Sequence, residues 1–157
     1  MLQIALKEWA VAVRAMEQGL QDVIFRKGGI QEHTGDFELS HDRFLLYPAR
    51  EHQKRELLRP NYHPLLDQTL DASEGHWVEI RSIAHVKGYY LVRSLEDARP
   101  YVDRHIWTDE FIGMRLDYKP DRPLHIIELE IELLDTPLRF LETTEYAGCR
   151  SWVELDL

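Results

Sequence analysis

The segment LHIIELEIELL, residues 124–134, has the most regular pattern in this chain. Apolar side chains alternate in it with three glutamates, so the pattern repeats every two residues. Successive side chains of a β-strand point to opposite faces of a sheet, and this period predicts a strand with one buried face and one solvated face. We expect this strand at or near the centre of a sheet, with its buried face formed by Ile127, Leu129, Ile131 and Leu133.

The N-terminal segment has a helical period instead. Its apolar residues recur at spacings of three and four, which predicts an amphipathic helix over residues 2–20. Charged residues interrupt its apolar run, so we expect neither a secretory signal nor a membrane span there. With a single cysteine, Cys149, this composition predicts a cytoplasmic protein without an intrachain disulfide.

The remaining segments alternate in clusters. Strands are predicted over residues 22–26, 37–47, 76–84, 88–92 and 152–155, the last at a sheet edge. Helices are predicted over residues 50–58, 94–106 (with a break at Pro100) and 109–115, and residues 61–75 are expected to form a loop with one helical turn. Clustered strands favour an α+β fold, a single domain over residues 1–157 whose curved, mostly antiparallel sheet or small barrel packs against the N-terminal amphipathic helix and flanking helices.

The charge of the chain is unevenly distributed. The formal net charge is −9, but residues 1–60 carry nine basic and nine acidic side chains, so all of the excess negative charge lies in residues 61–157. Residues 43–59 carry a net charge of +3. A negative molecule repels polyanions at long range, although a local basic face can still bind one. The alternative is that these bases solvate the outside of a helix.

The sequence Arg26-Lys27-Gly28-Gly29 is the first candidate site. Successive backbone N–H groups in a glycine-containing turn can bind an anion, and the two preceding bases would add positive charge. Neither the phosphate-binding GxxxxGK[ST] pattern nor the dinucleotide-binding GxGxxG pattern is present. An ordinary hairpin turn with exposed bases is the alternative.

A second group of candidates follows the predicted strand RFLLY. His52 lies at the start of a predicted helix, where it could act as a general base or donate to a phosphate. A hydrolase or nuclease using His52 and Glu51 is therefore an alternative to a binding module. The full set of predicted ligand-binding residues is Arg26, Lys27, Gly28, Gly29, Tyr47, Arg50, His52 and Arg150.

Cofactors and metals have little support. Four histidines of the N-terminal half lie about ten residues apart, at His33, His41, His52 and His63, and no HxH, HExxH or CxxC pattern supplies a ready pair of ligands. The glutamates of residues 124–134 fit a solvated strand face as well as a cation site. We therefore expect no cofactor and no metal, and we expect Cys149 to be part of the core rather than a nucleophile.

Several segments together resemble a known family. ALKEWAVAV (5–13), RKGGI (26–30), FLLYP (44–48) with EHQ (51–53), and GCRSWVEL (148–155) resemble domain of unknown function 1802, over nearly the whole chain. The resemblance implies a stand-alone bacterial domain and no particular reaction. A looser resemblance, at the level of the fold, is to the small barrels of the PUA, ASCH and EVE group, which bind RNA or modified bases in a cleft.

From these observations we expect a binding module. Its expected ligands are RNA, single-stranded DNA or a phosphorylated small molecule, and its expected partners include no membrane. A protein-interaction domain that uses the acidic C-terminal half is the third alternative.

Overall fold

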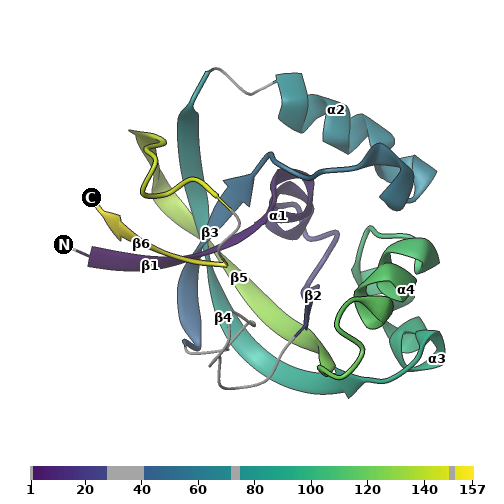
Figure 1. The fold of residues 1–157 in the computed structure, drawn as a ribbon. Helices are drawn as coiled ribbons and strands as arrows, with labels where there is room; N and C mark the ends of the chain where they lie inside the picture. The colour runs from purple at the N-terminus through teal and green to yellow at the C-terminus, as the bar shows by residue number, and fades with distance from the viewer. Residues whose placement is uncertain (1, 28–40, 72–74, 149–150) are drawn as a thin grey trace.

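A computed structural model describes residues 2–27, 41–71, 75–148 and 151–157, which form one curled sheet with helices against it (Figure 1). The order of the strands in the sheet is β2-β5-β4-β3-β1-β6. Their bounds are β1 Leu2–Trp9, β2 Val23–Lys27, β3 Arg43–Ala49, β4 Trp77–Val92, β5 Leu124–Leu141 and β6 Trp152–Asp156. Only β1 and β3 run parallel, and the other neighbouring pairs are antiparallel. The predicted α+β class with a mostly antiparallel curved sheet is confirmed.

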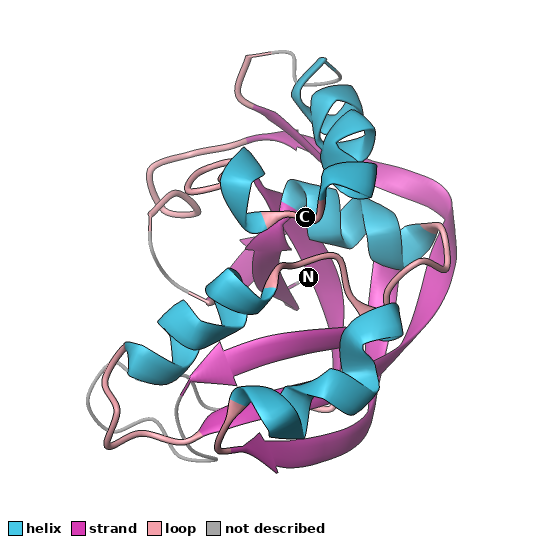
Figure 2. Ribbon diagram, turned by 90° about the vertical axis from the view of Figure 1, so that its right-hand side faces the viewer, coloured by secondary structure: helices cyan, strands magenta, loops and turns pink. Residues whose placement is uncertain are grey.

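Four α-helices lie in the described part of the chain (Figure 2). They are α1 Ala10–Glu17, α2 His63–Asp71, α3 Leu95–Ala98 and α4 Asp109–Asp117. Single 3-10 turns span Arg55–Leu57 and Pro60–Tyr62, and a longer 3-10 segment spans Arg99–Arg104. Because α1 lies inside the curl of the sheet, side chains on several sides of this short helix are buried (Figure 1).

The sheet curls into a half-barrel because β4 and β5 are long and irregularly paired. They have 16 and 18 residues, and their register shifts between Ile80 and Ser82 and again between Val86 and Gly88. Such irregularities bend a strand and increase its twist. The two chain ends lie side by side in Figure 1, where β1 pairs with β6 at one edge of the sheet.

The strand predicted from residues 124–134 is confirmed as the first part of β5, second from the edge of the sheet. Ile127 and Leu129 are buried, and Ile131 is half-buried. Leu133 is 60% exposed, so the prediction that it is buried is wrong. β2 pairs with β5 only as far as Glu128, and beyond that point β5 has β4 alone as a neighbouring strand.

The prediction of a helix over residues 2–20 is wrong in its first half. Residues 2–9 form β1, which lies between β3 and β6, and only residues 10–17 are α-helical. Every side chain from Ala5 to Ala10 is buried, including those of the charged residues Lys7 and Glu8, so this part of the chain is covered on both faces of the strand. A run that is buried on both faces carries no strand period, which is why the helical spacing of its larger side chains was misleading.

Other boundaries also differ from the predictions. The helix predicted over residues 50–58 is reduced to the turn Arg55–Leu57, and the predicted loop 61–75 contains α2. The strands predicted over 76–84 and 88–92 are one strand, β4. The break near Pro100 and the edge strand β6 are confirmed. The strand predicted near residues 37–39 lies outside the described residues.

Candidate functional site

Both basic residues that precede the predicted Gly28-Gly29 turn, Arg26 and Lys27, donate hydrogen bonds to other parts of the protein. Nη2 of Arg26 lies 2.5 Å from the carbonyl oxygen of Lys7 and 3.0 Å from Oε2 of Glu8, to which it donates. Nζ of Lys27 donates to the carbonyl oxygen of Leu116 in α4 at 2.8 Å. Burial lowers the pKa of Lys27, although the charge of Asp117 opposes this. These side chains hold β2 against β1 and α4.

Three of the predicted ligand-binding residues lie outside the described part of the chain. They are Gly28, Gly29 and Arg150. The anion-binding turn at Gly28-Gly29 therefore stays a prediction.

Tyr47 lies on the other face of the sheet from Arg26, and Arg50 follows the end of β3. The hydroxyl of buried Tyr47 donates to Oε2 of Glu142, and burial followed by this carboxylate raises the pKa of Tyr47. Arg50 donates to the carbonyl oxygens of Gly75, at 3.2 Å, and Trp77, at 2.8 Å. On β1, Lys7 lies beside Tyr47 whereas its neighbour Glu8 binds Arg26, so the two groups of candidates are separated by the strand.

His52 lies in the loop after β3, in an uncommon backbone conformation. Its φ of 68° is in the left-handed region, which residues other than glycine rarely adopt. The next residue, Gln53, accepts a hydrogen bond from the backbone N–H of Val11 through Oε1 at 2.9 Å. This contact fixes the loop against the first turn of α1, so His52 is presented at a set position.

His52 borders a hollow of about 270 Å³ between this loop, the end of β1 and α4. The walls of the hollow are largely aromatic: Trp9 ends β1, Phe111 lies in α4 and Tyr118 follows α4. The rings of Trp9 and Phe111 meet edge to face with their centroids 5.5 Å apart. Tyr118 is 57% exposed, so one wall of the hollow is accessible from solvent. We call this site the α4 hollow.

The polar groups of the α4 hollow are all basic or neutral. His52, Lys54 and Arg115 line it together with apolar Leu57 and Met114, and no Asp or Glu is among its described lining residues. In a protein with a net charge of −9, a hollow lined by bases and aromatic rings is a marked local departure. Its composition suits a ligand that is both flat and negatively charged.

Arg115 has the most informative environment of these bases. Burial lowers the pKa of its guanidinium, the nearby charge of Arg26 lowers it further, and Glu8 opposes both effects. The guanidinium carbon lies 5.0 Å from the centroid of the Phe111 ring, and no hydrogen bond or ion pair is made to Arg115 within the described part of the chain. An anion in the hollow would supply a direct ion-pair partner, which the described residues do not provide.

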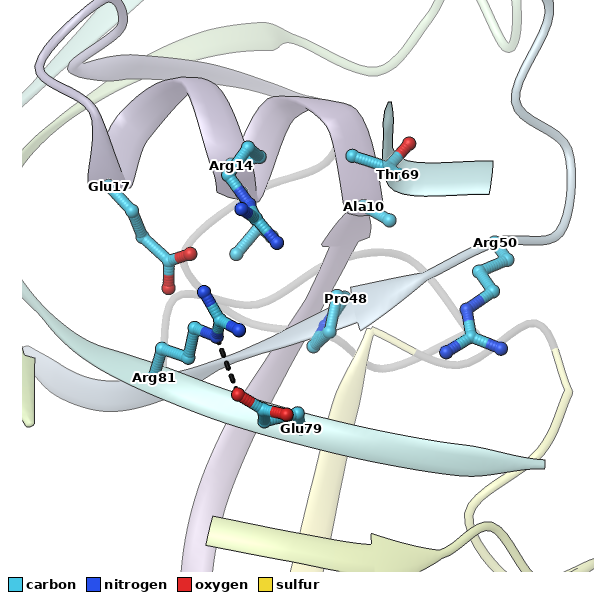
Figure 3. A pocket seen from close by; sticks show the side chains of 9 residues that line it. Ala10, Arg14, Glu17, Pro48, Arg50, Thr69, Glu79 and Arg81 are labelled. Carbon is cyan, nitrogen blue, oxygen red and sulfur yellow. Dashed lines mark hydrogen bonds and ion pairs between the residues drawn. The ribbon is translucent and has the colours of Figure 1, made fainter. Parts of the chain in front are cut away.

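The α4 hollow thus connects only part of the predicted set. His52 lines the hollow directly. The positive charge of Arg26 lowers the pKa of Arg115, which also lines it, and Lys27 donates a hydrogen bond to the end of α4. Tyr47 and Arg50 do not line the α4 hollow. Arg50 instead borders two other pockets, one of which is seen in Figure 3. Glu51 and His52, the proposed catalytic pair, line different hollows.

The sequence did not identify Trp9, Phe111 or Arg115 as members of a site. Trp9 fitted the apolar face of a helix, and α4 was read only as a short helix. The one available signal was the spacing of Phe111, Met114 and Arg115, which places an aromatic, a thioether and a base on one helical face.

Comparison with known proteins gives a family. The model of a family described as domain of unknown function (DUF1802) matches residues 5–157, nearly the whole chain. The chain belongs to the DUF1802 family. No curated protein and no solved structure matches it. The description of the DUF1802 family names no reaction and no ligand.

Two further observations bear on what this DUF1802 domain can hold. No group of three or more His, Cys, Asp or Glu residues suited to a metal ion occurs among the residues that the structure describes. Within the same residues, no helix has the length and apolar character needed to cross a membrane.

Proposed function

We propose that this DUF1802 domain is a binding module for a phosphorylated aromatic ligand, a nucleotide, held in the α4 hollow. The observation that supports this most directly is Arg115, a largely buried cation that faces an aromatic hollow without an ion-pair partner among the described residues. Among the aromatic residues of the hollow, exposed Tyr118 supplies a face on which a nucleobase can stack, beside the buried rings of Trp9 and Phe111. Arg115 and Lys54 supply charge for a phosphate.

The size and charge of the molecule favour one nucleotide over a long polyanion. A hollow of about 270 Å³ is at the small end of ligand sites, and a net charge of −9 opposes the approach of a long nucleic acid strand. A single-stranded RNA or DNA that places one terminal nucleotide in the hollow would use the same contacts. We retain the looser resemblance to PUA-like domains as part of the proposal, supported by the half-barrel shape of the sheet.

The enzymatic alternative has less geometric support. A hydrolase or nuclease would need His52 and Glu51 to act on one substrate, and they border separate hollows. We include in this proposal that the domain is bacterial, as the family resemblance implies, and cytoplasmic, as the composition predicts.

The test is a calorimetric titration with ligands that divide the nucleotide into its parts. The four nucleoside monophosphates, the matching nucleosides and ribose 5-phosphate are titrated separately. At least one monophosphate should bind roughly tenfold more tightly than its nucleoside and than ribose 5-phosphate, because each part uses only one half of the contacts. If ribose 5-phosphate binds as well as every monophosphate, or if nothing binds, the proposal is wrong.

The matched variants are Arg115→Met and Arg93→Met. Methionine keeps much of the apolar length of arginine and removes its charge, and Arg93 is an exposed arginine that lines none of the described hollows. Arg115→Met should weaken binding of the monophosphate about tenfold or more. Arg93→Met should leave it unchanged. Equal losses in both variants would indicate a general charge effect rather than this site.

A further inference from the structure

A second, smaller pocket lies beside α1 (Figure 3). It encloses about 90 Å³ between α1, α2 and the strands β3 and β4. Along α1 it is lined by Ala10, Arg14 and Glu17, which are spaced so that they share one face of the helix. Opposite them are Arg81 on β4 and, after the end of β3, Arg50 (Figure 3).

Glu17 is the central feature of this pocket. Its Oε2 accepts a hydrogen bond of 2.6 Å from the hydroxyl of Ser82, a fully buried residue. Burial raises the pKa of the Glu17 carboxyl; Ser82, Arg14 and Arg81 oppose that rise, and the charge of Glu79 adds to it. The net result is a carboxyl group that binds a proton more readily than an ordinary glutamate does.

The arginines around Glu17 are not equally engaged. Nε of Arg81 donates to Oε1 of Glu79 at 2.7 Å, and Arg50 donates to two backbone carbonyls. The guanidinium of Arg14 makes no hydrogen bond or ion pair to the described residues, and the side chain points into the pocket in Figure 3. A guanidinium that no described side chain binds therefore lies beside a carboxyl group of raised proton affinity.

The other groups that lie near Glu17 come from α2 and from a neighbouring hollow. From α2 the pocket receives only the neutral Thr69. On its far side Glu17 also borders a wider hollow of about 460 Å³, whose charged residues are Asp22, Asp103 and Arg104. Arg104 is already bound to Asp22, at 2.7 Å, and to Glu128, at 2.6 Å. None of these groups is among the causes of the pKa shift of Glu17, so Arg14, Glu79, Arg81 and Ser82 dominate.

We propose that this pocket binds one small oxyanion of the sulfate or phosphate class between Arg14, Arg50 and Arg81, and that Glu17 takes up a proton when the anion binds. The anion and the ionised Glu17 carboxylate compete for Arg14 and Arg81. Bringing a second negative charge into the pocket disfavours the ionised carboxylate, so the proton and the anion enter together. A volume of about 90 Å³ suits an oxyanion and is too small for a nucleotide.

The site differs from the α4 hollow in what it should bind. It has no aromatic wall, because its lining contains no Trp, Tyr or Phe among the described residues. It is therefore independent of the nucleotide proposal, and either can fail without the other.

Sulfate is the probe, because it has no protonation step near neutral pH that would obscure the proton taken up by Glu17. Calorimetry is done at pH 6.5 in two buffers that differ in ionisation enthalpy, with chloride holding the ionic strength constant. Between zero and one proton should be taken up per sulfate bound. The titrations are made in the Arg115→Met background as well as in the parent, so that sulfate in the α4 hollow is distinguished.

Two variants decide the outcome. Glu17→Gln keeps the size of the side chain and an acceptor for Ser82 but removes the titrating group. It should bind sulfate about fivefold more tightly, because one like charge is gone, and should take up no proton. Arg14→Met should weaken sulfate binding about tenfold, whereas Arg93→Met should not. Sulfate binding without proton uptake in the parent, weaker binding by Glu17→Gln, or no binding at all would overturn the proposal.

Discussion

Arg26 and Glu8 form an ion pair between two strands that are not neighbours in the sheet. Their Nη2 and Oε2 atoms are 3.0 Å apart, and only 14% and 6% of the two side chains is exposed. Arg26 is on β2, at one edge of the sheet, and Glu8 is on β1, next to the opposite edge. The pair therefore spans the open side of the half-barrel and holds its two ends together. Arg26, a predicted ligand-binding residue, is thus engaged in an ion pair within the fold.

Arg26→Met should destabilise the domain strongly. The substitution leaves Glu8 buried without its cation, and loss of one partner of a buried pair typically costs about 3–5 kcal/mol. Urea unfolding of the parent and the variant measures the difference. The matched control is Arg55→Met, because Arg55 pairs with Asp67 on the surface with about half of each side chain exposed. That change should cost at most about 1 kcal/mol.

A double substitution tests the cause of the effect. Arg26→Met combined with Glu8→Gln removes the buried charge together with its partner, and should recover part of the lost stability. If Arg26→Met and Arg55→Met have equal effects, the pair does not hold the half-barrel closed.

His105 should make the protein less stable in mild acid. Burial lowers the pKa of this side chain to about 4, and the charge of Arg59 adds to the effect. The unfolded chain, with a histidine pKa near 6.5, binds a proton at a pH where the folded protein does not. Stability is therefore present above about pH 6.5 and is lost as the pH falls toward 4, by up to roughly 3 kcal/mol.

The comparison variant is His105→Asn. Nδ1 of His105 accepts a hydrogen bond from the backbone N–H of Trp107 at 3.1 Å, and an asparagine oxygen can take over that role. Urea unfolding at pH 7 and pH 5 should show a smaller loss of stability in the variant than in the parent. The same pH dependence in both proteins would rule out His105 as its source.

The sequence predicted those strands that have one buried face and one solvated face. β6 and the first half of β5 were found because one face of each is solvated, which gives a period of two. β1 was missed because its residues from Ala5 onward are buried on both faces, and Trp9, the residue before α1, makes no capping side-chain hydrogen bond. No local signal marks the change from strand to helix at Trp9.

The candidate site was less predictable for a topological reason. The α4 hollow joins Trp9, His52 and Arg115, which are far apart in the sequence and meet only because β1 and β3 run parallel and end together near α4. Local clustering of bases drew attention to residues 26–29 and 43–59. Of the bases in these segments, Arg26 and Lys27 bind main-chain carbonyls or Glu8, and Arg55 binds Asp67.

The two halves of β5 should respond differently to truncation. Ile127→Ala removes a fully buried side chain and should cost about 2–5 kcal/mol. Leu133→Ala, on the same strand and within the same alternating pattern, should cost less than about 1 kcal/mol because Leu133 is 60% exposed. Thermal or urea unfolding of both variants measures the difference. A large loss at Leu133 would show that this side chain is covered in solution.

The dependence of strand binding on salt distinguishes a terminal nucleotide from an extended contact. A single strand that places one nucleotide in the α4 hollow, near Arg115 and Lys54, contacts one or two phosphates. Each contact contributes roughly 0.7 to the slope of log affinity against log salt concentration. A 5′-phosphorylated oligonucleotide measured by fluorescence anisotropy at several salt concentrations should therefore give a slope between about 0.7 and 1.4. Lys54→Met should reduce that slope by about 0.7, and Arg93→Met should leave it unchanged. A slope several times larger would show that many phosphates are contacted along an extended face, and the preference for a single nucleotide would then be wrong.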